Sequence, residues 1–195
     1  MMKLKEISLI SGFVSALLMS PAFAQWNLTN DQSNLNFISI KKNNIAEVHQ
    51  FKKMAGEVSD QGKIHLTIDL ASVNTNIDIR NERLKTLLFN VAQFPQAEFT
   101  GTLDMSSIAD MKAGDHKTIA VQGQLELHGV TQPVKTDLDI VRLNNDQIQV
   151  TTHMPLIVNA DRYGMADGIG KLMEVAGLPM ISSAVPVTFD LVFSR

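Results

Sequence analysis

A two-residue alternation of apolar and polar side chains constrains this chain more than any other feature. Residues 64–70 read IHLTIDL and residues 119–127 read IAVQGQLEL, so an apolar side chain recurs at every second position. The same period returns at residues 99–105, 137–140, 148–154 and 185–193. Because successive side chains of a strand point to opposite faces, the pattern predicts antiparallel strands with one buried and one polar face.

Short turn signals separate these predicted strands. Gly, Pro, Asn and Asp gather at residues 60–62, 113–115, 129–133 and 144–146. Further strands are expected at residues 26–29, 34–41 and 46–59, which brings the total to about eight or nine. Since most of them follow one another without a helix between, the chain is expected to be all-β, as a closed barrel or a sandwich.

Two segments break the alternation. Residues 79–91 place apolar side chains at helical spacing and predict an amphipathic helix of about three turns, with Asn76 or Asp78 as its cap. Residues 159–183 are rich in Gly and Met, and residues 171–176 are expected to form a short helix there. Because a connection this long is usually functional or mobile, we interpret it as a lid or mouth.

The first 24 residues have the features of an export signal. Lys3 and Lys5 precede an apolar run at residues 7–19, and Ala22 and Ala24 are small residues of the kind that a signal peptidase reads. We expect cleavage after Ala24, so that residues 25–195 form one domain. The alternative is a retained membrane anchor, although the run is shorter than the roughly 20 residues that span a bilayer.

Charge and cysteine content exclude some classes of function. The formal net charge is −3, and the basic residues form no cluster, so nucleic acid is not expected as a partner. The chain has no cysteine, which excludes disulfides, thiol chemistry and a lipoprotein anchor. No nucleotide-binding or hydrolase motif is present, and we expect neither a cofactor nor a catalytic constellation.

Histidine is the residue type with the most open interpretation. None of the five histidines lies at a metal-ligand spacing from another, so no metal is expected and most of them are interpreted as solvated. His49 differs because it shares one face of a strand with Glu47 and Phe51. An inward imidazole there could contact a polar group of a ligand, or it could be a core residue that the protein itself satisfies.

Charged residues on the helix at 79–91 also leave two interpretations. Arg80 and Arg83 are three residues apart on one face, and Glu82 is not at pairing distance from Arg80 on the same helix. Two guanidinium groups without a carboxylate would attract an anion such as a phosphate. The alternative is an ordinary solvated helix face at the end of a barrel.

Four stretches carry a resemblance to a known family. They read NFISIKKNNIAEVHQFKKMAGEV, IDLASVNTNIDIRNERLKTLLF, FPQAEFTGTL and GQLELHGVTQPV. Together they resemble the YceI-like family of exported bacterial proteins, and the resemblance spans residues 26–193. It implies an extended, antiparallel, eight-stranded lipocalin-like barrel with one helix packed at an end, and residence in the periplasm.

The resemblance also implies that a long internal pocket binds an isoprenoid-type lipid, with a quinone or a prenyl phosphate as head group. We expect this lipid to contact inward strand positions, the helix and the C-terminal segment. The expected ligand-binding residues are His49, Phe51, Leu66, Ile68, Arg80, Arg83, Leu84, Leu88, Phe99, Leu103, Leu125, Met154, Tyr163, Met165 and Phe189. Glycines at inward positions, such as Gly101 and Gly123, are interpreted as room for that ligand.

A carrier is the preferred function, and two alternatives remain. One is an enzyme on an apolar substrate that uses His49 with Arg80 or Glu47. The other is a module that binds a membrane redox partner through residues 159–183. Transient contact with a membrane or membrane protein, and a homodimer, are the further partners considered.

Overall fold

The computed structural model describes residues 25–195, and the expected signal peptide at residues 1–24 lies outside this range. Twelve strands form one antiparallel sheet. They are β1 (Trp26–Leu28), β2 (Asn34–Lys41), β3 (Ile45–Phe51), β4 (Met54–Val58), β5 (Lys63–Asp69), β6 (Val73–Asn74), β7 (Gln96–Thr102), β8 (His116–Leu127), β9 (Val130–Asn144), β10 (Gln147–Thr152), β11 (Leu156–Asn159) and β12 (Ala184–Ser194).

The sheet closes on itself. Its wall follows the order β1-β4-β5-β7-β8-β9-β10-β12, and β12 pairs again with β1 through Leu28 and Phe193. Strands β2, β3, β6 and β11 lengthen the sheet beyond this ring, since β2 and β11 both pair with β12. The prediction of an extended eight-stranded antiparallel barrel is therefore confirmed.

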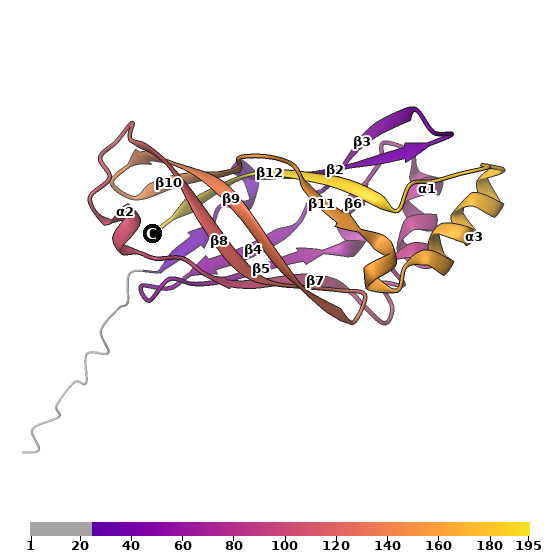
Figure 1. Cartoon of the computed structure of the whole chain (residues 1–195), viewed down its shortest axis with the longest axis horizontal. Coiled ribbons are helices and arrows are strands. Elements are labelled where there is room, and N and C mark those ends of the chain that lie inside the picture. Colours follow the sequence, from indigo (N-terminus) through magenta and orange to yellow (C-terminus); the bar gives the residue numbers. More distant parts are fainter. Residues whose placement is uncertain (1–24) are drawn as a thin grey trace, which may run out of the picture.

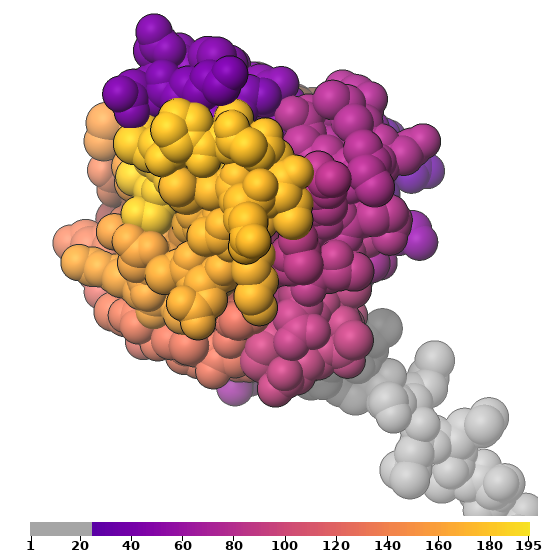
Figure 2. Space-filling view, turned by 90° about the vertical axis from the view of Figure 1, so that its right-hand side faces the viewer, coloured from indigo at the N-terminus to yellow at the C-terminus, as the bar shows by residue number. Residues whose placement is uncertain are grey.

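Helices gather mainly at one end of the elongated barrel (Figure 1). Figure 2 looks onto this end, where the hairpin of β2 and β3 lies beside α1 and α3; we call it the helical end. The helical elements are α1 (Asp78–Arg83), the π-helix η3 (Leu84–Leu88), α2 (Ser106–Ala109), α3 (Ala166–Ala176) and the short 3₁₀ turns η1 (Asn30–Gln32), η2 (Leu70–Ser72) and η4 (Ala160–Tyr163).

The helix predicted at residues 79–91 is shorter and less regular than expected. It is α-helical only in α1 and continues as the π-helix η3. The predicted cap is wrong, because Ile77 is the N-cap residue and makes no side-chain cap bond. Asn81 instead accepts hydrogen bonds from the backbone N–H and the hydroxyl of Thr75, at 2.8 and 2.6 Å, and so fixes the loop before the helix.

Helix α3 is longer than the segment predicted at residues 171–176. It packs against η3, and the missing side chain of Gly168 permits this contact, because a Cβ there would lie 2.7 Å from the carbonyl oxygen of Leu87. The helix ends at Gly177, whose φ of +60° is the left-handed conformation favoured at helix C-termini.

The predicted alternation is present in the walls. Ile140 in β9 and Ile148 in β10 are 1% and 3% exposed, while neighbouring side chains on the other face are accessible. The interpretation of the inward glycines is wrong in one respect. Gly101 and Gly123 pair across β7 and β8, and the ring of Phe99 occupies the space beside them.

We expect Gly123→Ala to lower the free energy of unfolding by about 1–3 kcal/mol, as overpacking of a core does. The added Cβ would lie 2.3 Å from the carbonyl oxygen of Thr100 and 2.4 Å from the Phe99 ring. Urea denaturation measures the effect. The matched control is Gly170→Ala in α3, where the added Cβ meets open space and stability should rise by about 0.5–1 kcal/mol. Equal stability of Gly123→Ala and the unaltered protein would contradict the packing described.

Candidate ligand-binding cavities

Two adjoining cavities occupy the interior. The larger, which we call the barrel cavity, has a volume of about 640 Å³, and the smaller, the end cavity, has about 300 Å³ and lies under the helical end. They share part of their walls, so they form two compartments of one elongated space. The shared lining residues are Leu35, Ile68, Leu125, Val158 and Val187.

The barrel cavity is lined by the apolar phase of the strands. In β5, for example, Ile64, Leu66 and Ile68 face it, while the residues between them do not. Most of its lining is aliphatic or aromatic, as in other sites for apolar ligands. The expected ligand-binding residues that line it are Leu66, Ile68, Phe99, Leu103, Leu125, Met154, Tyr163 and Phe189.

The end cavity joins strand residues to helix residues. Leu84 and Leu88 of η3 face Ile169 and Leu172 of α3 across it. The expected ligand-binding residues that line it are His49, Phe51, Ile68, Arg80, Arg83, Leu84, Leu88, Leu125 and Met165. Each residue of the expected set therefore borders one of the two cavities, and contact with a ligand remains a prediction.

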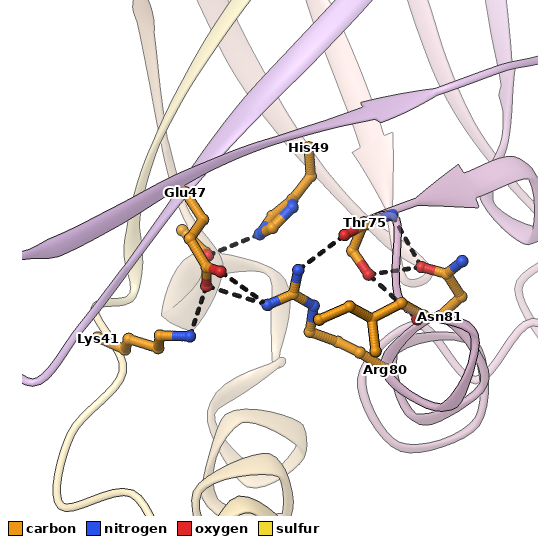
Figure 3. A network of polar contacts seen from close by, with 8 residues as sticks. Lys41, Glu47, His49, Thr75, Arg80 and Asn81 are labelled. Atoms are coloured by element: carbon orange, nitrogen blue, oxygen red, sulfur yellow. Dashed lines mark hydrogen bonds and ion pairs between the residues drawn. The ribbon is translucent and has the colours of Figure 1, made fainter.

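Ionic groups gather at the helical end (Figure 3). Glu47 of β3 contacts Lys41 of β2 at 2.6 Å and the Arg80 guanidinium at 3.0 Å, and Arg80 also donates to the carbonyl oxygen of Thr75 at 2.8 Å. The hydrogen bond from Lys41, and then the neighbouring Arg80, hold the pKa of Glu47 below its ordinary value. We call Lys41, Glu47, His49 and Arg80 the polar cluster.

This geometry corrects the expectation of two unpaired arginines. Arg80 does have a carboxylate partner, which is Glu47 of β3. Arg83 also lines the end cavity, but within residues 25–195 it forms neither an ion pair nor a side-chain hydrogen bond. With Lys41, Arg80 and Arg83 opposed by one carboxylate, the end cavity still has an excess of positive charge.

His49 has features of both interpretations given above, a ligand contact and a core residue that the protein itself satisfies. It is 4% exposed, and its Nε2 is 2.8 Å from the Ser39 hydroxyl. Its Nδ1 has no hydrogen-bond partner, and neither has Nε of Arg80, although both atoms are buried. Burial, and then the Arg80 charge, lower the pKa of His49, so the imidazole is neutral at neutral pH. Buried polar atoms are usually satisfied, so these two atoms are candidates for contact with a polar group of a ligand.

Ser39 and His49 are in contact as the nucleophile and the general base of a hydrolytic triad are. In a hydrolytic triad a carboxylate orients the other ring nitrogen. Within residues 25–195 no carboxylate contacts Nδ1 of His49, and Glu47 is held instead by Lys41 and Arg80. The pair therefore lacks the carboxylate that orients a triad histidine. Its polar atoms can still bind a polar group of a ligand.

Sequence reasoning missed Ser39 and Lys41 as lining residues. In β2 the inward phase runs Leu35, Phe37, Ser39 and Lys41, and all four line the end cavity. Ser39 and Lys41 follow Leu35 and Phe37 at every second position, and this spacing could have placed them on the inward face of the strand.

The other histidines lie on the outer surface. His116 and His153 both contact Asp139, at 3.3 and 3.0 Å, and the pKa of Asp139 falls to about 2 through hydrogen bonds from Thr118 and then His153. Within residues 25–195 no group of three His, Asp or Glu side chains is arranged to hold a metal ion. In the same range no helix combines the length and apolar character that crossing a membrane requires.

An extended antiparallel barrel with an apolar interior cavity and polar groups at one end defines the class of small-molecule-binding barrels. Comparison with known families identifies the particular family. The chain belongs to the family with a YceI-like domain, whose model matches residues 26–193.

Among solved structures, the chain is similar to a polyisoprenoid binding domain from Saccharophagus degradans, described as implicated in plant cell wall breakdown. The two are 37% identical with a TM-score of 0.86, over 89% of this chain and 99% of that domain. BcnA of Burkholderia cenocepacia has the same fold, with 19% identity and a TM-score of 0.66 over 85% of this chain and 98% of BcnA.

Among curated proteins, protein YceI of Salmonella arizonae is 38% identical over 85 residues, which is 43% of this chain and 40% of that protein. Protein YceI of Salmonella newport matches to the same extent. The matched part thus spans less than half the length of these relatives.

We expect His49→Gln to reduce the loss of stability on mild acidification. The pKa of His49 is lower in the folded protein than its ordinary value of 6.5, so the unfolded chain binds the proton more readily. The stability linked to this residue is fully present above pH 6.5 and is lost as the pH falls through the folded pKa.

Urea denaturation at several values between about pH 5 and pH 8 measures this dependence. The matched control is His65→Gln, on the outer phase of β5. If both variants lose stability on acidification as steeply as the unaltered protein, His49 is not buried as described.

Proposed function

We propose that this protein is a periplasmic carrier that holds a long isoprenoid-type lipid, with its chain in the barrel cavity and its head group in the end cavity. The observation that carries the proposal is the asymmetry of the interior. Apart from polar residues between 132 and 137 and at 159–162, the barrel wall is apolar, and unsatisfied buried polar atoms occur at His49 and Arg80 beside the end cavity. The similarity to a polyisoprenoid binding domain supports the chemical class of the ligand.

The physical properties of the cavities suit a chain more than a compact ligand. Burial of each CH₂ group contributes about 0.8 kcal/mol, so a chain of modest length suffices for tight binding after its ordering cost is subtracted. Because aliphatic walls recognise a chain by area alone, they discriminate weakly between chain lengths. The polar cluster would then set the direction in which the lipid lies.

The head group should accept hydrogen bonds. Nε of Arg80 can only donate, and Nδ1 of the neutral His49 donates when Nε2 accepts from the Ser39 hydroxyl. A quinone carbonyl can accept a hydrogen bond from either donor. A prenyl phosphate can accept as well, and its charge would also be attracted by Arg83 and Lys41.

Periplasmic location is proposed from the sequence of residues 1–24, which has the charge pattern, apolar run and small residues of a cleaved export signal. A carrier in that compartment would move a lipid across the aqueous space between membranes. The absence of cysteine fits an exported protein that needs no disulfide.

The first experiment is native mass spectrometry of the protein purified from the periplasm, followed by solvent extraction of its ligand. We expect one isoprenoid lipid per chain. Leu125→Asp should release it, because Leu125 lines both cavities and a charge there opposes an apolar chain. The control is Val48→Asp, at an outward position that is 63% exposed. Circular dichroism verifies that both variants fold, and retention of lipid by folded Leu125→Asp would reject the carrier.

A second experiment separates the two head groups. Arg83→Gln should weaken binding of a prenyl phosphate about tenfold or more, since a hydrogen bond to a charged group contributes about 1.5–3 kcal/mol, and it should leave binding of a prenyl quinone unchanged. Isothermal titration with both lipids measures this. The control is Lys85→Gln, because Lys85 already pairs with Glu82 on the same helix at 2.9 Å. Equal affinities of Arg83→Gln and the unaltered protein for the phosphate would exclude Arg83 as its partner.

A further inference from the structure

One side of the barrel wall is not joined by a strand ladder. Residues 130–137 of β9 pair with β8, and β9 meets β10 only from Leu138 onward. Among the strands of residues 25–195, β11 pairs only with β12. We call the interval between residues 130–137 and residues 154–159 the seam. In Figure 1, β9 and β11 run apart toward the helical end.

Two hydrogen bonds mark the ends of the seam. The N–H of His153 donates to the carbonyl oxygen of Asp137 at 3.1 Å, beside the last paired residues of β9 and β10. The side-chain amide of Gln132 donates to the carbonyl oxygen of Arg162 at 3.3 Å, near the helical end.

The lining of the barrel cavity shows that it opens through the seam. In a closed wall only alternate residues face the interior, as in β5. Along the seam, however, every residue from 132 to 138 and every residue from 154 to 159 borders the barrel cavity. Residues of both phases can border one cavity only where it reaches the outside between the two strands.

The rim of the seam is poorly suited to strand pairing. Its β9 edge is mixed, with Gln132, Lys135, Thr136 and Asp137, and its other edge carries exposed apolar side chains. Met154 and Ile157 are 64% and 62% exposed, although both border the cavity. Met154 was expected inside the barrel, but β10 ends at Thr152 and leaves it on the rim. Pro133 lies within β9 and Pro155 just before β11, and proline is confined to sheet edges because it has no N–H to donate.

The end of the barrel opposite the helical end (Figure 1) is closed. Trp26 is 2% exposed and lines the barrel cavity there, and the guanidinium groups of Arg142 and Arg195 cover its ring at 5.1 and 4.7 Å. Ile108 of α2 is also buried against the same cavity. A ligand therefore reaches the interior by the seam or by the helical end.

We propose that the seam is a lateral portal through which the apolar chain of the lipid enters and leaves the barrel sideways. This inference rests on the proposed carrier function and adds the route to it. A chain that enters through a slit passes sideways along its whole length at once, beside the apolar side chains of Met154 and Ile157. Passage through the helical end would instead draw every isoprene unit past the ionic groups of the polar cluster.

The absence of cysteine permits a direct test. Ile157→Cys, modified with a bulky maleimide, places an obstacle on the rim of the seam, at a side chain that is 62% exposed. The control is Val48→Cys with the same label, on the outer face of β3 at the helical end. Trp26, the single tryptophan, reports uptake of a short-chain prenyl quinone by fluorescence quenching in stopped flow.

We expect the label at residue 157 to slow association and release by the same factor, about ten- to a hundredfold, with the equilibrium affinity unchanged. That pattern characterises a portal, whereas an obstructed binding site loses affinity. Unchanged rates, or slowing only by the label at residue 48, would contradict the lateral portal. Binding of the quinone in the same experiment would still support the carrier function. If the unlabelled protein bound no prenyl quinone and carried no lipid from the periplasm, the carrier and the portal would both fail.

Discussion

Backbone hydrogen bonding around a hollow interior is the constraint on which the rest of this structure depends. A cavity lined by apolar side chains provides no partners for N–H and C=O groups, so the wall must satisfy its own. Strand β12 is central to this, because it pairs with β1, β2, β10 and β11 along its length. It closes the eight-stranded ring and also carries the extension toward the helical end. The seam begins where β10 ends and β11 fails to meet β9.

Ionic groups are costly inside such a barrel, which explains their position. Glu47 and Arg80 are only partly exposed, and each has more than one partner, so neither charge is left uncompensated. The π-helix η3 and helix α3 cover the adjoining apolar side chains and leave one narrow region where charge, a neutral histidine and an apolar cavity meet. This gives the long interior a direction that aliphatic walls alone could not provide.

The local sequence pattern predicted the barrel. The features that it did not predict depend on contacts between residues far apart in the sequence or on where elements end. Alternation in segments such as 64–70 identified the inward residues, because a strand's period depends only on its own sequence. The Glu47–Arg80 pair joins residues 33 positions apart, and no local rule places them together. The cap of α1 was also missed, because the loop before the helix is held by hydrogen bonds from Thr75, which precedes the helix, to Asn81, which lies within it. Met154 followed the strand period in sequence, yet its strand stops two residues earlier.

The separation of the polar cluster from the seam has a consequence for what the barrel can select. In the proposed complex, His49 and Arg80 would hold the head group at one end of the lipid, and the chain would lie beside the seam for much of the barrel cavity. Excess chain can then leave through the seam instead of being compressed against Trp26 at the closed end. The barrel would therefore bind lipids of different chain lengths with similar affinity. Discrimination between lipids would depend on the polar atoms of the end cavity. The proposed carrier would therefore distinguish lipids by their head groups and accept chains of different lengths.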